Sequence, residues 1–106
     1  MALAFETLLV ETASPHVLLV TLNRPESSNA FNTQMANDLV NLFENISMDH
    51  NAHRAIILTG AGDRAFCAGG DLKERNGMSN EAWFAQHLVY ERMSRAILRI
   101  ARLMRS

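Results

Sequence analysis

The sequence lacks the features that mark secreted, membrane-spanning or nucleic-acid-binding proteins. Cys67 is the only cysteine among 106 residues, so no disulfide can form within the chain, and a reducing, cytoplasmic setting is expected. Ten basic and eleven acidic side chains give a net charge of −1, which offers no general attraction for nucleic acid or an anionic membrane. No uncharged apolar run is long enough to span a bilayer, and the first six residues have no basic start typical of a secretory signal. The composition predicts one small soluble domain.

Metal-ligand spacing is also missing. The chain has four histidines, and the only closely spaced pair is His50 and His53, in a polar stretch that predicts a loop. A solvated loop is the simpler interpretation of that pair. We therefore expect no metal site.

What the sequence does contain is apolar patterning of an α/β domain. Strand-like runs come first and predict an antiparallel hairpin, with the turn at 13–15. A helix capped by Asn32 follows, then a short strand that reads as buried, and this order predicts a crossover with parallel pairing. The expected elements are strands at 8–12 and 16–22, a helix at 32–48, a strand at 55–59, and a long helix with Ser79 or Asn80 as its cap and strong helical patterning over 83–104.

The long final helix is amphipathic and needs a cover for its apolar face. That face holds Val89, Met93, Ala96, Ile97, Ile100, Leu103 and Met104. The predicted sheet is small for this task, so another chain or further sequence should cover the face, and we expect self-association. A second face carries four arginines, Arg92, Arg95, Arg99 and Arg102. This row could bind phosphate, RNA or coenzyme A (CoA), but a solvated face is favoured, since Glu91 and the near-neutral total dilute the field.

Two glycine-containing segments follow the 55–59 strand. The first, 60–65, matches G-x-G-x-x-A, a dinucleotide-binding pattern. That pattern needs a helix and then a second strand ending in an acid, whereas here another glycine turn follows at once. Asp63 would also sit where a pyrophosphate should lie. A loop that requires small residues is the better interpretation.

The second segment, 65–74, permits two interpretations. Adjacent Gly69 and Gly70 allow a tight turn in which the backbone N–H of Ala68 could stabilise a developing oxyanion. Alternatively this is an ordinary turn with Asp71 as the N-cap of the next helix, which composition alone favours. Cys67 lies between Phe66 and Ala68 without a fixed base beside it, so it reads as a packed thiol rather than a nucleophile.

An ordered set of motifs resembles the crotonase superfamily, and within it the enoyl-CoA hydratase/isomerase family. The resemblance extends from Leu8 to Arg102. The motifs, in chain order, are Asn23-Arg24-Pro25-Glu26, Asn29-Ala30-Phe31-Asn32, Ala55-Ile56-Ile57-Leu58-Thr59-Gly60 and Ala65-Phe66-Cys67-Ala68-Gly69-Gly70-Asp71-Leu72-Lys73-Glu74. The resemblance implies an α/β fold with a truncated ββα spiral core, in which residues 1–106 are the N-terminal part of a single crotonase-like domain.

The resemblance also implies a substrate and a reaction. The family adds water to a trans-2-enoyl-CoA and stabilises an enolate with two backbone N–H groups. By resemblance Ala68 supplies one of these, and the CoA-binding positions are Ser28, Ala30, Ala68, Gly69, Gly70, Asp71 and Leu72. CoA enters as part of the substrate, so no separate cofactor is expected. A homo-oligomer acting on an acyl-CoA thioester is the implied assembly.

Several parts of the family pattern are not found in this sequence. The second oxyanion N–H and the two catalytic glutamates belong to segments that would follow residue 106, and Glu74 and Glu81 do not match the catalytic positions. The chain alone is therefore expected to be inactive. Isomerase, decarboxylase or dehalogenase chemistry of the same superfamily remains open, as does a non-catalytic CoA-binding or oligomerisation module. Leu72-Lys73-Glu74-Arg75 and the nearby Met78-Ser79 also resemble the methylglutaconyl-CoA hydratase branch, one member of which binds AU-rich RNA through a lysine-bearing first helix. The matching helix at 33–48 has no lysine or arginine, so RNA binding by that route is not expected.

Overall fold

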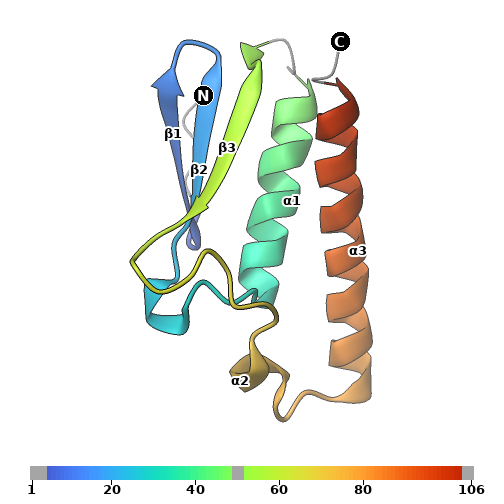
Figure 1. The fold of residues 1–106 in the computed structure, drawn as a ribbon. Helices are drawn as coiled ribbons and strands as arrows, with labels where there is room; N and C mark the ends of the chain where they lie inside the picture. Colours follow the sequence, from blue (N-terminus) through green and yellow to red (C-terminus); the bar gives the residue numbers. More distant parts are fainter. Residues whose placement is uncertain (1–4, 49–51, 104–106) are drawn as a thin grey trace.

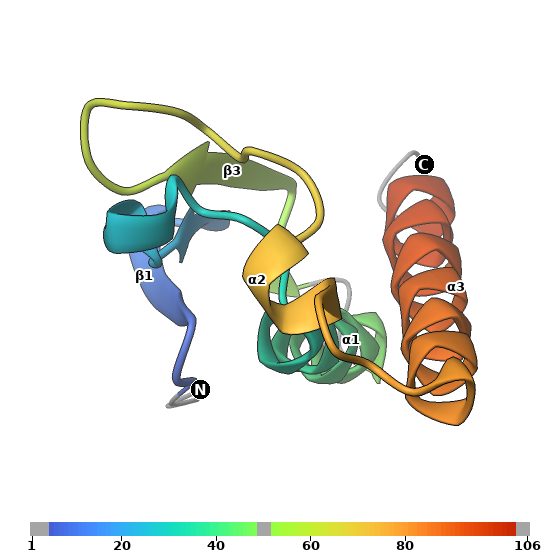
Figure 2. The same ribbon diagram turned by 90° about the horizontal axis from the view of Figure 1, so that it is seen from below.

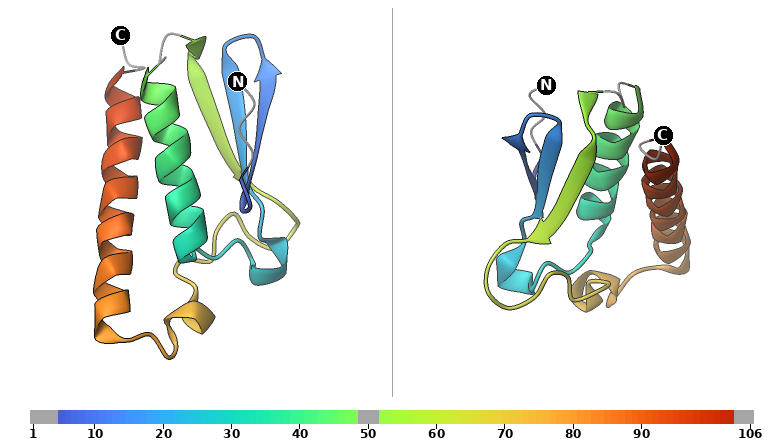
Figure 3. Two further views of the ribbon diagram at one scale, coloured as in Figure 1. Left: turned by 180° about the vertical axis from the view of Figure 1, so that it is seen from behind. Right: turned by 45° about the horizontal axis from the view of Figure 1, so that its top comes forward.

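The computed structural model describes residues 5–48 and 52–103 and shows an α/β fold. A three-stranded sheet in the order β1-β2-β3 packs against helix α1, and α3 lies along the other side of α1 (Figure 1). The views from below and behind show α1 between the sheet and α3 (Figures 2 and 3). Within the described ranges, no helix has the length and apolar character needed to cross a membrane.

The first two strands form the predicted antiparallel hairpin. β1 spans Leu8–Ser14 and β2 spans Val17–Leu22, with an irregularity in register between Thr12 and Ser14. The turn lies at Pro15 and His16 rather than at 13–15. Proline favours the first central position of a turn, and His16 adopts a φ of 69°, a conformation that a second central position of this kind requires. β1 therefore continues two residues further than predicted.

The crossover also follows the prediction. Helix α1 spans Thr33–Met48, and the Asn32 side chain caps it by accepting a hydrogen bond from the Met35 N–H at 2.8 Å. β3 spans Ala55–Gly60 and pairs in parallel with β2.

The prediction that the 55–59 strand is buried is wrong for this structure. Ile57 is 48% exposed and Leu58 is 37% exposed. In the sheet formed by the described residues, β3 is an edge strand that pairs with β2. Its aliphatic composition suits a central strand, but in the described ranges no further element covers these two side chains.

The core lies between the sheet and α1. Apolar side chains from β1, β2 and α1 alternate into it at strand and helix periods, and burial of each stabilises the fold by about 1.5–3 kcal/mol. The largest fully buried apolar side chains are Val20, Leu22, Met35, Leu39, Val40, Leu42 and Ile46. Asp38 is also buried, and its carboxylate accepts hydrogen bonds from the N–H and hydroxyl of Thr7 at 3.1 and 2.7 Å. These two bonds fasten the start of the chain to α1.

Helix α3 spans Asn80–Leu103 and begins three residues before the strongest apolar pattern. Ser79 is its cap, since the Ser79 hydroxyl accepts a hydrogen bond from the Ala82 N–H at 3.1 Å. α1 covers part of the apolar face of this helix, and the expectation that another chain or further sequence covers the rest stays a prediction. Ala96 and Ile100 are buried there, whereas Ile97 stays 36% exposed. Met104 lies outside the described residues.

Candidate active site

The candidate site lies at the carboxyl ends of β2 and β3, which meet at one edge of the sheet because the strands are parallel. The loop after β2 includes a short 3₁₀ turn, η1, at Pro25–Ser27. The loop after β3 leads into α2, a single turn at Leu72–Arg75. Figure 2 shows these two loops and α2 gathered at the same end of the molecule.

Asn29 holds the two loops together. It is fully buried, with a left-handed φ of 56° that asparagine tolerates better than most residues. Its side-chain oxygen accepts from the Arg24 N–H at 2.8 Å, and its amide donates to the carbonyls of Ala61 and Ala65, both at 2.9 Å. Asn29 belongs to the motif Asn29-Ala30-Phe31-Asn32, but the sequence alone did not predict its role in joining the loops. The one hint in the sequence was an asparagine within a polar loop, because a single side-chain amide can donate and accept hydrogen bonds and so join two backbone segments.

Gly60 allows the loop after β3 to fold back on itself. A Cβ at this position would clash with the backbone oxygen of Phe66 and lie 2.8 Å from the Asn29 amide nitrogen. The glycine is needed for this close backbone approach. This supports the interpretation of 60–65 as a loop that requires small residues, rather than a dinucleotide site.

The glycine turn is fixed by backbone hydrogen bonds to the loop after β2. The Phe31 N–H donates to Gly69 O at 2.7 Å, and the Asp71 N–H donates to Phe31 O at 2.8 Å. These bonds form an isolated parallel bridge between Phe31 and Gly70. In such a bridge the N–H of Gly70 itself points away from Phe31, and in the described ranges it has no hydrogen-bond acceptor.

The backbone N–H of Ala68, which was expected to face the substrate as an oxyanion donor, is used within the fold instead. Its N–H donates to the carbonyl oxygen of Ser28 at 3.0 Å, so it is not available to a ligand in this structure. The free donor in the turn is the N–H of Gly70, two residues further on. Sequence reasoning missed this exchange because Ser28 and Ala68 are 40 residues apart and only the fold pairs them.

Asp71 acts as the N-cap of α2, as one interpretation of the sequence predicted. One carboxylate oxygen accepts from the N–H groups of Lys73 at 3.0 Å and Glu74 at 3.3 Å, and the other pairs with Arg24 at 3.0 Å. Desolvation by burial pushes the pKa of Asp71 upward, but these backbone bonds and the Arg24 guanidinium outweigh it and lower the pKa below its ordinary value.

This lowered pKa gives a testable pH dependence. The stabilisation from ionised Asp71 is fully present above the ordinary carboxyl pKa and is lost as the pH falls through the lower pKa of the folded state. Asp71→Asn should destabilise the chain at about pH 7, and its deficit in the free energy of unfolding should shrink at about pH 3. Urea unfolding at both pH values measures this. Asp63→Asn, an exposed loop carboxylate, is the matched control, and a deficit for Asp71→Asn that is equal at both pH values would contradict the prediction.

The predicted CoA-binding positions converge on one groove of about 320 Å³. Six of the seven lie on its lining, and the seventh, Gly69, accepts the Phe31 N–H hydrogen bond beside it. The lining residues are Glu26, Ser27, Ser28, Ala30, Ala68, Gly70, Asp71, Leu72 and Lys73. Leu72 is 73% exposed at the rim, a position that offers apolar surface to a ligand.

Glu74 is held in a structural network rather than left free for chemistry. One of its oxygens accepts from the N–H of Thr33 at 2.9 Å, at the start of α1, and from the amide of Gln86 at 2.6 Å. The hydroxyl of Tyr90 donates to Phe31 O at 3.2 Å. Burial and the nearby Glu74 carboxylate raise the pKa of Tyr90 above its ordinary value, with the Arg75 charge opposing them. This network fastens α2 to α1 and α3.

Cys67 is a packed thiol, as predicted. It is half-buried against the hydrophobic core, and its sulfur accepts from the Gly69 N–H at 3.4 Å. Across residues 5–48 and 52–103, no group of three or more histidine, cysteine, aspartate or glutamate side chains could hold a metal ion.

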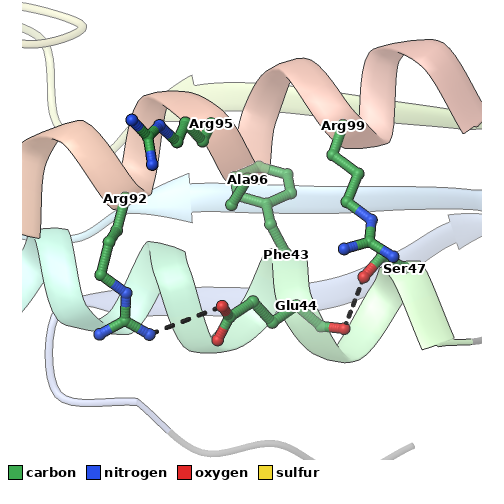
Figure 4. Close-up of a pocket in the computed structure, with 7 residues that line it drawn as sticks. All are labelled: Phe43, Glu44, Ser47, Arg92, Arg95, Ala96 and Arg99. Atoms are coloured by element: carbon green, nitrogen blue, oxygen red, sulfur yellow. Dashed lines mark hydrogen bonds and ion pairs between the residues drawn. The ribbon is translucent and has the colours of Figure 1, made fainter.

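The arginine row lines a second, smaller groove between α1 and α3. Arg92, Arg95 and Arg99 lie along α3 above Phe43 of α1 (Figure 4). Arg92 pairs with Glu44 at 3.6 Å, and Arg95 pairs with Glu91. Both arginines are more than half exposed, so the row is a solvated face with carboxylates interspersed.

The sheet, the crossover helix and the glycine turn together define a crotonase fold. The family model for enoyl-CoA hydratase/isomerase matches residues 12–101. The chain therefore belongs to the enoyl-CoA hydratase/isomerase family.

Known relatives agree with this assignment. The chain is 43% identical over 70 residues to Bacillus subtilis YngF, which is named as an enoyl-CoA hydratase/isomerase. The aligned region covers 66% of this chain and 26% of YngF. It is 35% identical over 94 residues to the rat mitochondrial Delta(3,5)-Delta(2,4)-dienoyl-CoA isomerase, covering 80% of this chain and 28% of the relative. The enoyl-CoA hydratase structure from Bacillus anthracis superposes with a TM-score of 0.80 at 35% identity, over 86% of this chain and 35% of that one. The chain thus spans about a quarter of the length of these curated relatives.

Proposed function

We propose that this chain forms part of the acyl-CoA site of an enoyl-CoA hydratase. The observation that carries the proposal is the groove itself: it collects six of the seven predicted CoA-binding positions beside the free N–H of Gly70. A CoA thioester would lie along the groove with its carbonyl oxygen at that N–H. The enolate oxygen that forms when water adds to the enoyl double bond would then accept this hydrogen bond.

The donor in this proposal is Gly70 rather than Ala68. A donor is useful only if it is aimed at the developing charge before the reaction starts. The N–H of Ala68 is occupied by Ser28, whereas the flanking bonds of Gly69 and Asp71 to Phe31 fix the peptide of Gly70 in place. Ala68 then contributes to the site by holding the turn against the loop after β2.

Isomerisation of an enoyl-CoA is the second candidate reaction. It passes through the same kind of enolate and would use the same donor, and the similarity to a dienoyl-CoA isomerase favours it as the alternative. The acids that would separate hydration from isomerisation, or from decarboxylation, are not assigned in the described residues. A CoA-binding or oligomerisation module without chemistry would bind the thioester without turnover.

We also propose that the protein works as a homo-oligomer. Apolar side chains on β3 and α3 support this, since exposed apolar groups of this size favour association. Ile57 and Leu58 on the edge strand and Leu98 on α3, which is 57% exposed, are the residues concerned. Sedimentation of the chain as a monomer at high concentration would contradict this part of the proposal.

Gly70→Pro tests the proposed donor, because proline has no N–H. With acetyl-CoA we expect calorimetry to show binding to the unmodified chain, and the proline variant to bind about 2- to 10-fold more weakly, the value of one hydrogen bond. An isotope-labelled thioester carbonyl should also lose the polarised infrared band that the donor produces.

Gly70→Ala is the matched control, since it keeps the N–H. Its Cβ would lie 3.1 Å from the flexible end of Arg75, which can move aside. Equal carbonyl bands for the alanine and proline variants would contradict the assignment of Gly70. Absence of any binding of acetyl-CoA to the unmodified chain would contradict the CoA site as a whole.

A further inference from the structure

Phe31 sets the direction of the proposed donor. Its N–H donates to Gly69 O at 2.7 Å, which holds the peptide group between Gly69 and Gly70. This peptide group is planar and trans, so the Gly70 N–H points opposite to the bound carbonyl and away from Phe31. The Asp71 N–H donates to Phe31 O at 2.8 Å on the other side of Gly70. Any tilt of the Phe31 backbone would therefore turn the donor as well.

Helix α3 reaches this backbone through the side chain of Tyr90. The residue is half-buried, and its hydroxyl donates to Phe31 O at 3.2 Å across 59 residues of sequence. Phe31 O thus accepts two hydrogen bonds, one from the glycine turn and one from α3. A carbonyl oxygen has two lone pairs, so both bonds can form at once. Gln86, one helical turn earlier on α3, reaches Thr33 and Glu74 instead.

The Tyr90 ring is itself held by neighbouring rings on α3. The ring centroids of Tyr90 and His87 lie 5.9 Å apart, and those of His87 and Trp83 lie 3.8 Å apart. His87 Nδ1 donates to Trp83 O at 2.9 Å, which fixes the imidazole. Burial raises the pKa of Tyr90 above its ordinary value, so the hydroxyl keeps the proton that it donates at neutral pH. These contacts hold Tyr90 as a fixed donor to Phe31.

We infer that Tyr90 is a positioning residue for the oxyanion donor and acts through Phe31. The inference rests on the proposed function, which assigns the donor to the Gly70 N–H. A donor stabilises a developing enolate best when its direction is fixed before the reaction, and the second hydrogen bond to Phe31 O restricts the backbone that sets this direction. Tyr90 bonds Phe31 rather than Gly70 itself, so loss of its hydroxyl should loosen the donor without removing it.

Backbone amide relaxation, measured by NMR on the 106-residue chain, tests the inference without a ligand. Tyr90→Phe keeps the ring and removes only the hydroxyl. In the unmodified chain we expect the Gly70 N–H to have an order parameter of about 0.85, typical of rigid backbone, and in the variant a value lower by about 0.1 or more. Val20 should keep its value in both proteins, since β2 is paired on both sides.

Ser94→Ala is the matched control, because it removes the α3 hydroxyl one turn further on, which donates to Tyr90 O at 3.1 Å within the helix. It should leave the order parameter of Gly70 unchanged, and circular dichroism should show that both variants are folded. Unchanged order at Gly70 in Tyr90→Phe, an equal loss at Gly70 and Val20, or the same loss in Ser94→Ala would overturn the inference.

Binding of acetyl-CoA separates this inference from the proposed function. The labelled carbonyl band of Tyr90→Phe should lie between the bands of the unmodified chain and Gly70→Pro, because a loosened donor polarises the carbonyl only part of the time. A band identical to that of the unmodified chain would overturn the positioning role. Failure of acetyl-CoA to bind to the unmodified chain, with Gly70 loosened in Tyr90→Phe, would instead overturn the proposed function, and Tyr90 would remain the residue that fixes the Gly70 N–H.

Discussion

The 106-residue chain should hydrate crotonyl-CoA about 10²- to 10⁴-fold more slowly than an enoyl-CoA hydratase with a positioned general acid and base, because such groups contribute that much to the rate. The site supports this expectation. The two carboxylates that follow the glycine turn in sequence are both held by contacts that fix the fold. Asp71 caps α2 and pairs with Arg24, and Glu74 accepts hydrogen bonds from Thr33 and Gln86. A steady-state assay that follows loss of the enoyl absorbance measures the rate.

The control for this assay is Gly70→Pro, assayed at the same protein concentration. Trace activity that is equal in the unmodified chain and the proline variant comes from a contaminating enzyme, since the proposed donor is gone. Turnover as fast as that of such a hydratase would show that the chain supplies its own acid and base. The expectation of an inactive chain would then be wrong.

Replacing Asn29 should have the largest effect on stability. Asn29→Ala removes one acceptor and two donors from a fully buried site and leaves the N–H of Arg24 and the carbonyls of Ala61 and Ala65 without partners. Alanine also resists the left-handed backbone conformation at this position. We expect a loss of about 3–5 kcal/mol in the free energy of unfolding. A domain of this size has only about 5–15 kcal/mol in total.

Urea unfolding followed by circular dichroism measures this loss, and two variants separate its causes. Asn29→Gly removes the same hydrogen bonds without the backbone strain, so it should cost less than the alanine variant but still about 2 kcal/mol or more. Asn45→Ala removes an exposed asparagine whose amide bonds only Asn41 O, and it should change stability by about 0.5 kcal/mol or less. If Asn29→Ala lowered the free energy of unfolding no more than Asn45→Ala, the conclusion that Asn29 holds the two loops together would be wrong.

The elements of the fold were predictable because their signals are local. Alternating and helical apolar periods identified the hairpin, α1 and α3, and the strand–helix–strand order predicted the parallel pairing of β2 and β3. The turn at Pro15 and His16 was misplaced because its position depends on a left-handed histidine, which composition does not reveal. The burial of the last strand was overestimated because Ile57 and Leu58 would suit either a central strand or an edge strand.

The site was predictable as a region but not as a set of contacts. The glycines and Asp71 identified the turn, and the cap on α2 followed from residue types alone. Which N–H remained free was decided by Ser28 and Phe31, both far away in sequence, so Ala68 was expected where Gly70 is the better candidate. The pairing of Glu74 with Thr33 and Gln86 is likewise a product of the fold.

The contacts of Asn29 affect which nearby positions can change in sequence between related proteins. Its amide donates to main-chain oxygens of Ala61 and Ala65, so the anchoring depends on the path of the chain and hardly at all on the side chains there. Asp63 and Arg64, which lie between those two anchors, are exposed. Substitutions at these positions can accumulate without dismantling the donor geometry at Gly70. Orthologues should therefore differ most in this segment, and libraries randomised there should retain folded, CoA-binding members.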